Sequence, residues 1–363
     1  MSNNMSEILF VIHLDKFTKG FYTFICNNYN HYKLYFLFYG TNHQFDFQAD
    51  EKKCFYYDSY RTIESSDTVV GIAKRCNAII YSGLFGSQHC VFKFGLITLK
   101  KTYIHFWGND FYALSNKPKK TKQRLNSFIK RWFINNAKGI INLIPQDYKE
   151  LCKICHPKGK HYVAPMCGDG SAIEIVKSLR DCTKSISPVK ILLGNSATES
   201  NQHIQALQML EKYKHEDIMI ICPLSYGGDE AYRDKIISFG KAMYKDKFTP
   251  ITEYMSQDEY FKIIADCQIA IFNNNRQQAM GNINVALAMR CKVYIREDSP
   301  MWATYCDERE MDIFSVNDIE HLDFFDFTNI GCGFDKNYEK YLQFSDVKNN
   351  MLAWQKVFES IDN

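Results

Sequence analysis

The sequence KILLGNSATESNQHIQ, residues 190 to 205, contains the features of a strand, a turn and a helix start in that order. Its apolar residues up to Leu193 are typical of a buried strand, and Gly194, Asn195 and Ser196 are typical of a tight turn. When a strand runs through such a turn into a helix, backbone N–H groups are presented to which a phosphate can bind. The stretch therefore predicts one strand–turn–helix unit of an α/β fold and, more weakly, a phosphate site.

A second stretch, NNNRQQAMGNINVALAM at residues 273 to 289, repeats this order after another strand-like segment. Its polar loop contains Arg276 and leads into a helix start with the sequence Gly-Asn. An arginine at a strand end can neutralise a diphosphate, and glutamine amides can bind sugar hydroxyls or base edges. No Asp-x-Asp pair occurs in the chain, so we expect Arg276 and helix ends to supply the positive charge. Two such turns in one half of the chain predict a nucleotide-diphosphate pocket.

The chain has 363 residues, which is too long for one ordinary core and favours two domains. Apolar residues make up 46% and charged residues 23%, values that fit a globular protein and exclude wholesale disorder. A formal net charge of +3 gives no argument for a nucleic-acid partner. The 13 cysteines are scattered, and the N-terminus lacks a signal-peptide pattern, so we expect reduced thiols and a cytoplasmic location.

Short, continuous apolar runs alternate with amphipathic stretches along both halves. Continuous runs predict strands that are covered on both faces, hence parallel sheets with flanking helices. The expected strands are 7–14, 33–40, 76–83, 101–108, 138–145, 159–166, 189–193, 216–224, 268–274 and 291–298. A polar stretch, residues 167–189, separates the two series. We expect domains at 1–168 and 187–335, followed by a helical segment at 336–363.

Two strand ends in the first half carry candidate acceptor-binding residues. In HFWGNDFY, residues 105–112, the Trp107 ring could stack on a sugar and Asp110 could accept hydrogen bonds from its hydroxyls. A buried tryptophan with an aspartate that caps the next segment is the simpler interpretation of this pattern. After the first expected strand, the carboxylate of Asp15 could act as a general base, although an aspartate there is more often a helix cap.

The segment Lys117–Phe133 combines seven basic residues with apolar residues at helical spacing and contains no acidic residue. A basic amphipathic helix with Trp and Phe can lie on an anionic membrane surface, where each basic residue adds up to ~1 kcal/mol. The alternative is an ordinary helix whose apolar stripe packs on the sheet and whose basic face is solvated. Both interpretations stay open, and nucleic-acid binding is disfavoured because the rest of the chain is not basic.

The run Cys152-Lys-Ile-Cys155-His156 matches the pattern of covalent haem attachment, and His161 follows at a spacing that suits a zinc site. Haem attachment of this kind needs an exported chain, and no export signal is visible. The run lies between two expected strands, where a helix through QDYKELCKICH is the simpler interpretation. We therefore expect no metal and no cofactor.

Several of these stretches resemble glycosyltransferase family 56, the transferase family of the enterobacterial common-antigen pathway. They are HFWGNDFY (105–112), LLGNSATESNQHI (192–204), Pro223–Tyr232, ITEYMSQDEYF (251–261), NRQQAMGN (275–282) and REDSPMW (296–302). The resemblance spans residues 13 to 302 in the same order and is weaker over 30–100. The sequence departs from the family pattern at the Ser-Tyr-Gly-Gly turn after Leu224 and at Asn282-Ile-Asn, positions at which sugar groups could be read.

The resemblance implies an α/β fold of the GT-B type, with two facing Rossmann-like domains and a C-terminal helix that crosses back to the first. The first domain would bind the acceptor and the second the nucleotide sugar. The implied donor-binding residues are Gly194, Asn195, Ser196, Asn201, His203, Tyr226, Glu230, Glu253, Arg276, Gln277, Gln278, Gly281 and Asn282. The implied acceptor-binding residues are His13, His105 and Trp107, and the candidate catalytic residues are Asp15 and Asp110.

The implied activity is the transfer of a 4-acetamido-4,6-dideoxyhexose from a dTDP donor to an undecaprenyl-diphosphate-linked oligosaccharide, without a metal. The expected location is the inner face of the cytoplasmic membrane, with Lys117–Phe133 at the lipid surface. Two alternatives stay open: a sugar-nucleotide epimerase or hydrolase on the same scaffold, and a non-catalytic scaffold that binds membranes or glycans. Measuring donor turnover with and without acceptor distinguishes a transferase from an epimerase or hydrolase. Measuring nucleotide preference distinguishes it from a non-catalytic scaffold.

Overall fold

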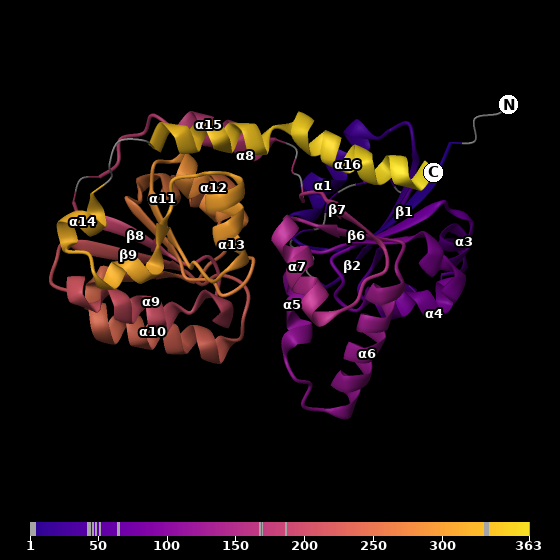
Figure 1. The fold of residues 1–363 in the computed structure, drawn as a ribbon, viewed down its shortest axis with the longest axis horizontal. Coiled ribbons are helices and arrows are strands. Elements are labelled where there is room, and N and C mark those ends of the chain that lie inside the picture. Colours follow the sequence, from indigo (N-terminus) through magenta and orange to yellow (C-terminus); the bar gives the residue numbers. More distant parts are fainter. Residues whose placement is uncertain are drawn as a thin grey trace. The chain divides into compact units, whose positions relative to one another are not determined.

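The computed structural model describes residues 5–41, 45, 47, 49–50, 52–63, 66–166, 168, 170–185, 187–329 and 334–362. The chain forms two compact units (Figure 1). Unit 1 contains Met1–Asp169 and Val347–Asn363, and unit 2 contains Gly170–Asp346. Each unit has its own sheet and its own core, and each is described separately below.

Unit 1 is built on a parallel sheet of seven strands in the order β3-β2-β1-β4-β5-β6-β7 (Figure 1). The strands are β1 (Glu7–His13), β2 (Lys33–Tyr39), β3 (Cys54–Tyr57), β4 (Ala78–Ser82), β5 (Thr102–His105), β6 (Gly139–Asn142) and β7 (Lys160–Val163). In the centre, Ile8 pairs with Leu34 on one side and with Ala78 on the other. Strand order reverses at β1 and β4, which is where ligands bind in doubly wound sheets.

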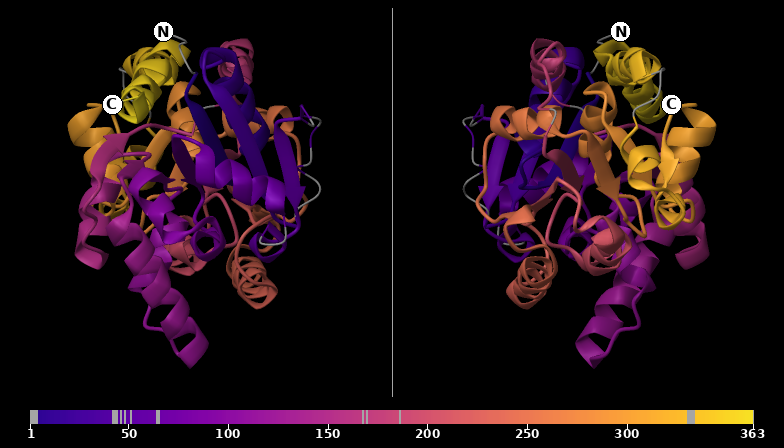
Figure 2. Two further views of the ribbon diagram at one scale, coloured as in Figure 1. Left: turned by 90° about the vertical axis from the view of Figure 1, so that its right-hand side faces the viewer. Right: turned by 90° about the vertical axis from the view of Figure 1, so that its left-hand side faces the viewer.

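Helices cover both faces of this sheet because its strands carry apolar residues on both sides. The helices are α1 (Thr18–Asn28), α2 (Tyr60–Ile63), α3 (Asp67–Arg75), α4 (Val91–Phe94), α5 (Asn109–Tyr112), α6 (Thr121–Asn136), α7 (Pro145–Ile154) and α16 (Val347–Asp362). Phe10 and Trp354 belong to the core on one face, and Tyr81 and Phe133 belong to the core on the other. The first turns of α6, drawn in magenta, project away from the sheet (Figures 1 and 2).

Unit 2 repeats the architecture with six parallel strands in the order β10-β9-β8-β11-β12-β13. The strands are β8 (Val189–Leu193), β9 (Ile218–Pro223), β10 (Phe248–Ile251), β11 (Ile269–Phe272), β12 (Lys292–Ile295) and β13 (Phe314–Ser315). The helices are α8 (Ser171–Leu179), α9 (His203–Met209), α10 (Glu230–Tyr244), α11 (Gln257–Asp266), α12 (Met280–Ala288), α13 (Pro300–Trp302), α14 (Phe324–Thr328) and α15 (Phe334–Ser345). Strand order reverses here between β8 and β11, so the loops after these strands meet at one edge.

The segment 336–363, expected as one helix on the first domain, contains two. α15 packs on α12 in unit 2, whereas α16 belongs to unit 1. The indole of Trp354 donates to the Pro165 carbonyl at 2.9 Å and the Tyr103 hydroxyl donates to the Ser360 carbonyl at 3.0 Å. The chain therefore returns to its first unit through α16 alone.

Candidate active site

Gly194 directly follows β8, in a conformation that only glycine adopts readily. Its φ is +72°, and a Cβ atom there would lie 2.8 Å from His203 Nε2 and 2.9 Å from Asn201 Oδ1. Its N–H donates to the Ile271 carbonyl at 2.9 Å, which ties the turn to neighbouring β11. The turn that the sequence predicts is thus held where strand order reverses.

Asn201 lies inside this turn and holds it together. Its Oδ1 accepts the backbone N–H of Asn195 at 3.2 Å, and its Nδ2 donates to the Ser196 carbonyl at 3.0 Å and to Thr198 Oγ1 at 2.9 Å. Its side chain is almost completely buried. Asn201 therefore acts on the shape of the turn and supports the groups around it.

Gln278 connects the turn after β8 to the loop after β11. Its Nε2 donates to Asn195 Oδ1 at 3.0 Å and to the hydroxyls of Ser196 and Thr198, both at 2.9 Å. Its Oε1 accepts from Ser200 Oγ at 2.5 Å. Both expected turns thus belong to a single polar network, which we call the switch-point network.

Tyr226 adds the loop after β9 to this network. Asn195 Nδ2 donates to the Tyr226 hydroxyl at 3.0 Å, and the Tyr226 carbonyl accepts the Ala197 N–H at 2.8 Å. Asn282, in the first turn of α12, donates to the Tyr260 hydroxyl of α11 at 2.9 Å. Three loops at the carboxyl edge of the sheet therefore converge on the predicted residues.

The helix after the Gly194 turn differs from the expectation. A single 3₁₀ turn, Glu199–Asn201, comes first, and α9 begins only at His203. Because the backbone N–H groups of Asn195 and Ala197 already have acceptors within the unit, the turn offers fewer donors to a phosphate than predicted. The longer α12, which begins at Met280, is the better helix start for an anion.

His203 is fully buried beside the turn and contacts the Tyr232 hydroxyl through Nδ1 at 3.2 Å. Burial lowers the pKa of His203 to about 4, so its ring is neutral at pH 7. Its Nε2 and the side-chain oxygens of Asn273, Asn274 and Gln277 are buried without a hydrogen-bond partner among the described residues. Buried polar atoms in this state gain from a water or a ligand group that pairs with them.

The remaining predicted donor residues surround the network. Arg276 is half-buried, and its Nη1 donates to the Gln277 carbonyl at 2.9 Å. Gly281 lies in the first turn of α12 with open space beside it. Glu230 and Glu253 are exposed, and no described hydrogen bond joins either to the switch-point network.

In unit 1, His13 ends β1 among aromatic rings. Its ring centroid lies 4.9 Å from that of Phe85, 5.3 Å from that of Tyr39 and 6.2 Å from that of Trp107. Burial lowers the pKa of His13, while the nearby Asp15 carboxylate opposes this shift. Asp15 is half-buried, and its backbone N–H donates to Thr18 Oγ1 at 2.8 Å. An imidazole and a carboxylate thus lie close together at this edge.

Asp110 lies in a different environment from Asp15. Its carboxylate is buried and accepts the backbone N–H groups of Leu84 and Trp107, each at 3.0 Å. Burial raises its pKa, although the charge of the buried Lys130 and the backbone bonds act in the opposite direction. This geometry is that of a carboxylate that organises two loops. It differs from the simpler interpretation of HFWGNDFY, because the N-cap residue of α5 is Gly108 and Trp107 is only half-buried.

Trp107 and His105 share the hydroxyl of Ser82. Trp107 Nε1 donates to Ser82 Oγ at 3.0 Å, and His105 Nδ1 lies 2.9 Å from the same oxygen. His105 is fully buried and its burial lowers its pKa to about 3, whereas Trp107 is half-buried. Trp107 is therefore better placed than His105 to touch a bound molecule.

Several residues of these sites were not predicted from the sequence. They are Ser82, Thr198, Ser200, Tyr232, Asn274 and Tyr260. Ser82 ends β4, Asn274 closely follows β11, Thr198 and Ser200 lie further along the loop after β8, and Tyr232 and Tyr260 are on helices. Small polar residues near strand ends also occur in ordinary turns, so this signal was not specific.

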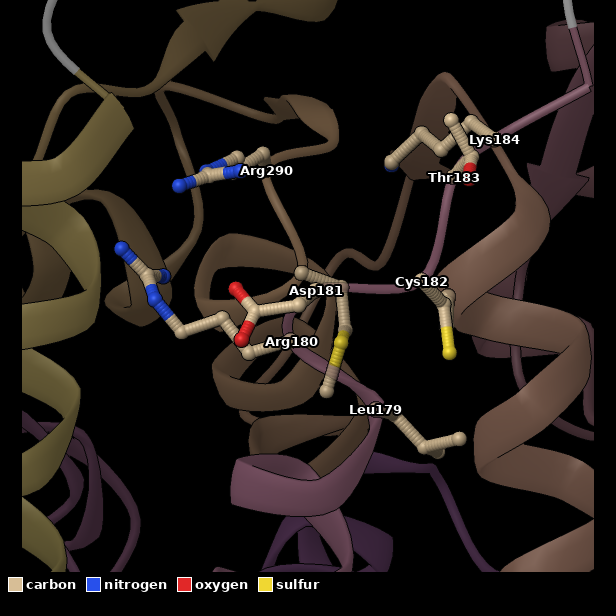
Figure 3. A pocket seen from close by; sticks show the side chains of 9 residues that line it. Leu179, Arg180, Asp181, Cys182, Thr183, Lys184 and Arg290 are labelled. Carbon is tan, nitrogen blue, oxygen red and sulfur yellow. The ribbon is translucent and has the colours of Figure 1, made fainter.

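A hollow of about 330 Å³ in unit 2 lies elsewhere (Figure 3). It is lined by Leu179, Arg180, Asp181, Cys182, Thr183, Lys184, Ala265, Met289 and Arg290. These residues precede β8, β11 and β12, so the hollow is at the amino edge of the sheet. Arg180 and Arg290 both bind Asp335, at 2.6 and 3.1 Å, which leaves little charge for a ligand.

Within the described residues, no three His, Cys, Asp or Glu side chains gather as a metal-binding group. Cys152 is exposed on α7, Cys155 is buried just beyond it, and His161 of β7 stacks on Tyr148 at 3.9 Å. Among all the residues that the structure describes, no helix is both long enough and apolar enough to cross a bilayer.

The fold is of the GT-B type, with two Rossmann-like units that each contain a reversal of strand order. Solved structures share the fold at low sequence identity. A glycosyltransferase from Rickettsia africae matches at TM-score 0.66 with 14% identity, covering 99% of both chains. A UDP-forming α,α-trehalose-phosphate synthase from Burkholderia xenovorans matches at TM-score 0.61 with 7% identity over 98% of this chain and 100% of that one.

The UDP-N-acetylglucosamine 2-epimerase from Rickettsia bellii also has this fold, at TM-score 0.56 and 14% identity over 99% of this chain and 98% of that one. The fold alone therefore does not separate transferases from epimerases. The family model described as 4-alpha-L-fucosyltransferase, glycosyl transferase group 56, matches residues 27–337. The chain belongs to this family, and the protein is a glycosyltransferase.

Proposed function

We propose that this enzyme transfers a 4-acetamido-4,6-dideoxyhexose, or a related deoxy sugar, from a dTDP donor to an undecaprenyl-diphosphate-linked oligosaccharide. The reaction would serve the assembly of a bacterial surface polysaccharide of the O-antigen or common-antigen type. The observation that carries the proposal is the switch-point network, in which Gln278 joins the loops after β8 and β11. It lies at the edge where nucleotides bind in doubly wound sheets.

The donor diphosphate would bind between the Gly194 turn and the start of α12. As the bond from the anomeric carbon to the diphosphate oxygen breaks, negative charge develops on the leaving group. Arg276 and the N-terminus of α12 would stabilise this charge. Gly281, beside open space, lets the backbone come close to a phosphate.

The acceptor hydroxyl oxygen would form the new bond to the anomeric carbon and lose its proton to a base. Asp15 suits this task better than Asp110, because the Asp110 carboxylate is buried and already accepts two backbone N–H groups. His13 beside it would orient the acceptor, and the Trp107 ring would stack on a sugar. His105 would act through Ser82, which it shares with Trp107.

A lipid-linked acceptor would require the enzyme to work at the inner face of the cytoplasmic membrane. Lys117–Phe133 would meet the anionic lipid, since the first turns of α6 are exposed and basic. The second half of α6 packs in the core through Phe133 and Ile134. The lipid contact is therefore proposed for the first half alone.

The test is donor turnover with and without the lipid-linked acceptor. A transferase releases dTDP at least about 10²-fold faster when acceptor is present. Equal rates without acceptor would indicate a hydrolase, and conversion of the donor sugar to an isomer would indicate an epimerase. A thermal-shift screen of dTDP, UDP and GDP separates both from a non-catalytic scaffold, which need not prefer dTDP.

A further inference from the structure

Five large apolar side chains of unit 1 are exposed on two segments that are far apart in sequence. Phe92 is on α4, Leu96 and Ile97 are on the 3₁₀ segment Leu96–Lys101, and Leu125 and Phe128 are on α6. Between 55% and 68% of each residue is exposed. We call these five residues the apolar patch.

The two segments are packed against each other. The rings of Phe92 and Trp132 are stacked, with centroids 6.3 Å apart and 4° between their planes. Phe128 lies one helical turn before Trp132, and Leu125 lies one turn before Phe128. His89 Nε2 lies 2.8 Å from Asn126 Oδ1, and α6 also contacts the segment Leu96–Lys101. The apolar patch is therefore one surface and not five scattered residues.

The two segments that carry the apolar patch have charged residues of one sign only. Residues 87–101 and 117–136 contain no aspartate or glutamate. Seven cations on these segments are exposed, namely Lys93, Lys100, Lys117, Lys119, Lys120, Lys122 and Arg124. A surface that combines exposed rings with cations alone is complementary to an anionic interface with an apolar interior, and a lipid bilayer has both properties.

The topology places the start of α6 at the carboxyl edge of the unit 1 sheet. The chain leaves the sheet at the carboxyl end of β5, passes Trp107 and α5, and runs back along α6 to the amino end of β6. Thr121 is therefore on the same edge of the sheet as His13 and Trp107, the proposed acceptor side. A lipid surface at this end of α6 would hold a lipid-linked acceptor beside that edge.

We infer that the apolar patch inserts into the headgroup region of an anionic bilayer, with Phe92, Leu96 and Ile97 as a second lipid contact beside α6. The cations attract the surface from solution, and the apolar side chains then enter it, which makes binding partly resistant to salt. This inference rests on the proposed function, because a lipid-linked acceptor explains why a glycosyltransferase presents such a surface.

The test is co-sedimentation of the full chain with vesicles of phosphatidylcholine, with or without phosphatidylglycerol, at 0.15 and 1 M salt. Wild type binds the anionic vesicles and keeps part of this binding at high salt. The variant Phe92→Ser/Leu96→Ser/Ile97→Ser loses at least about tenfold in partition coefficient. The control Met5→Ser/Leu352→Ser/Phe325→Ser, which changes residues equally exposed elsewhere, binds as wild type does.

The inference is overturned if the patch variant binds as well as wild type, if phosphatidylglycerol makes no difference, or if salt removes all binding. It is also overturned if wild type elutes as a dimer in gel filtration and the patch variant as a monomer, because a second copy would then cover the patch. Transfer to a water-soluble acceptor analogue should be equal in both variants and wild type. Vesicle binding without any transfer would contradict the proposed function and not the inference.

Discussion

Gln278 and Asn195 are joined by a 3.0 Å hydrogen bond from Nε2 to Oδ1, which links the loop after β11 to the loop after β8. The same amide reaches the hydroxyls of Ser196 and Thr198. Because β8 and β11 are neighbours at the reversal of strand order, one side chain fixes the spacing of the two loops proposed to hold the donor.

Replacing Gln278 by Met removes all of these hydrogen bonds at similar volume. We expect kcat/KM to fall by about 10- to 10²-fold, because loops held loosely misplace the donor. The free energy of unfolding of unit 2 should fall by about 1–3 kcal/mol. The exposed Gln208→Met is the matched control and should change neither quantity. Full turnover in Gln278→Met would mean that the network does not position the donor.

Gly194 and Gly281 should respond oppositely to alanine. Gly194→Ala places a methyl group within 3 Å of His203 and Asn201 at positive φ, so we expect a loss of about 1–3 kcal/mol in stability. Gly281→Ala lies in a helix with open space, so stability should rise by about 0.5–1 kcal/mol. If a phosphate approaches this backbone, Gly281→Ala still lowers donor affinity. Thermal melts and calorimetry separate these effects; unchanged donor binding in Gly281→Ala would remove α12 from the site.

Substitution of Asp15 should lower activity, whereas substitution of Asp110 should lower stability. Asp15→Asn removes the proposed base, and we expect kcat to fall by about 10²- to 10⁴-fold with an unchanged unfolding curve. Asp110→Asn weakens the bonds from Leu84 and Trp107 and leaves Lys130 buried without its opposing charge, so unit 1 should lose about 2–4 kcal/mol. If Asp110→Asn lowered kcat and Asp15→Asn lowered stability instead, Asp110 would be the base and Asp15 the structural residue.

Acid should destabilise both units through buried histidines. Burial lowers the pKa of His105 to about 3 and of His203 to about 4, from 6.5. Between these values and 6.5 the unfolded chain binds more protons than the folded one, so stability falls as pH falls. From pH 7 to 5, each histidine should cost its unit about 2 kcal/mol. In urea melts, His203→Gln should reduce the amount by which the stability of unit 2 falls between pH 7 and pH 5. His215→Gln, at an exposed position, should leave this fall as it is in wild type. An unchanged slope in His203→Gln would contradict this cause.

Much of the fold could be predicted because parallel strands buried on both faces leave long apolar runs. The strands that escaped prediction lack this signal. β3 is partly exposed, β10 contains Pro250 at the sheet edge, and β13 has only two residues. The break between α15 and α16 at Asp346 was missed because the apolar pattern continues across it.

The residues of the candidate site were predictable where they lie in a loop between a strand and a helix, as Gly194 and Gln278 do. The sequence could not show that Asn201 Oδ1 accepts the Asn195 N–H, because this hydrogen bond depends on a 3₁₀ turn that precedes α9. The residue type also does not show how deeply a side chain is buried. Asp110 and Asp15 differ in this respect, because Asp110 is buried and Asp15 is half-buried. The sequence indicated only the α6 part of the apolar patch, since Phe92 is brought to α6 by packing against Trp132.

The central claim is that the carboxyl edge of β8 and β11 holds the donor diphosphate. Its most direct test is calorimetric titration of dTDP into wild type, Arg276→Ala and Arg290→Ala, since Arg290 lines the hollow at the opposite edge. We predict one dTDP per chain, at least about tenfold weaker binding in Arg276→Ala with a kcat about 10²-fold lower, and wild-type behaviour in Arg290→Ala. Loss of dTDP binding in Arg290→Ala but not in Arg276→Ala would contradict the account.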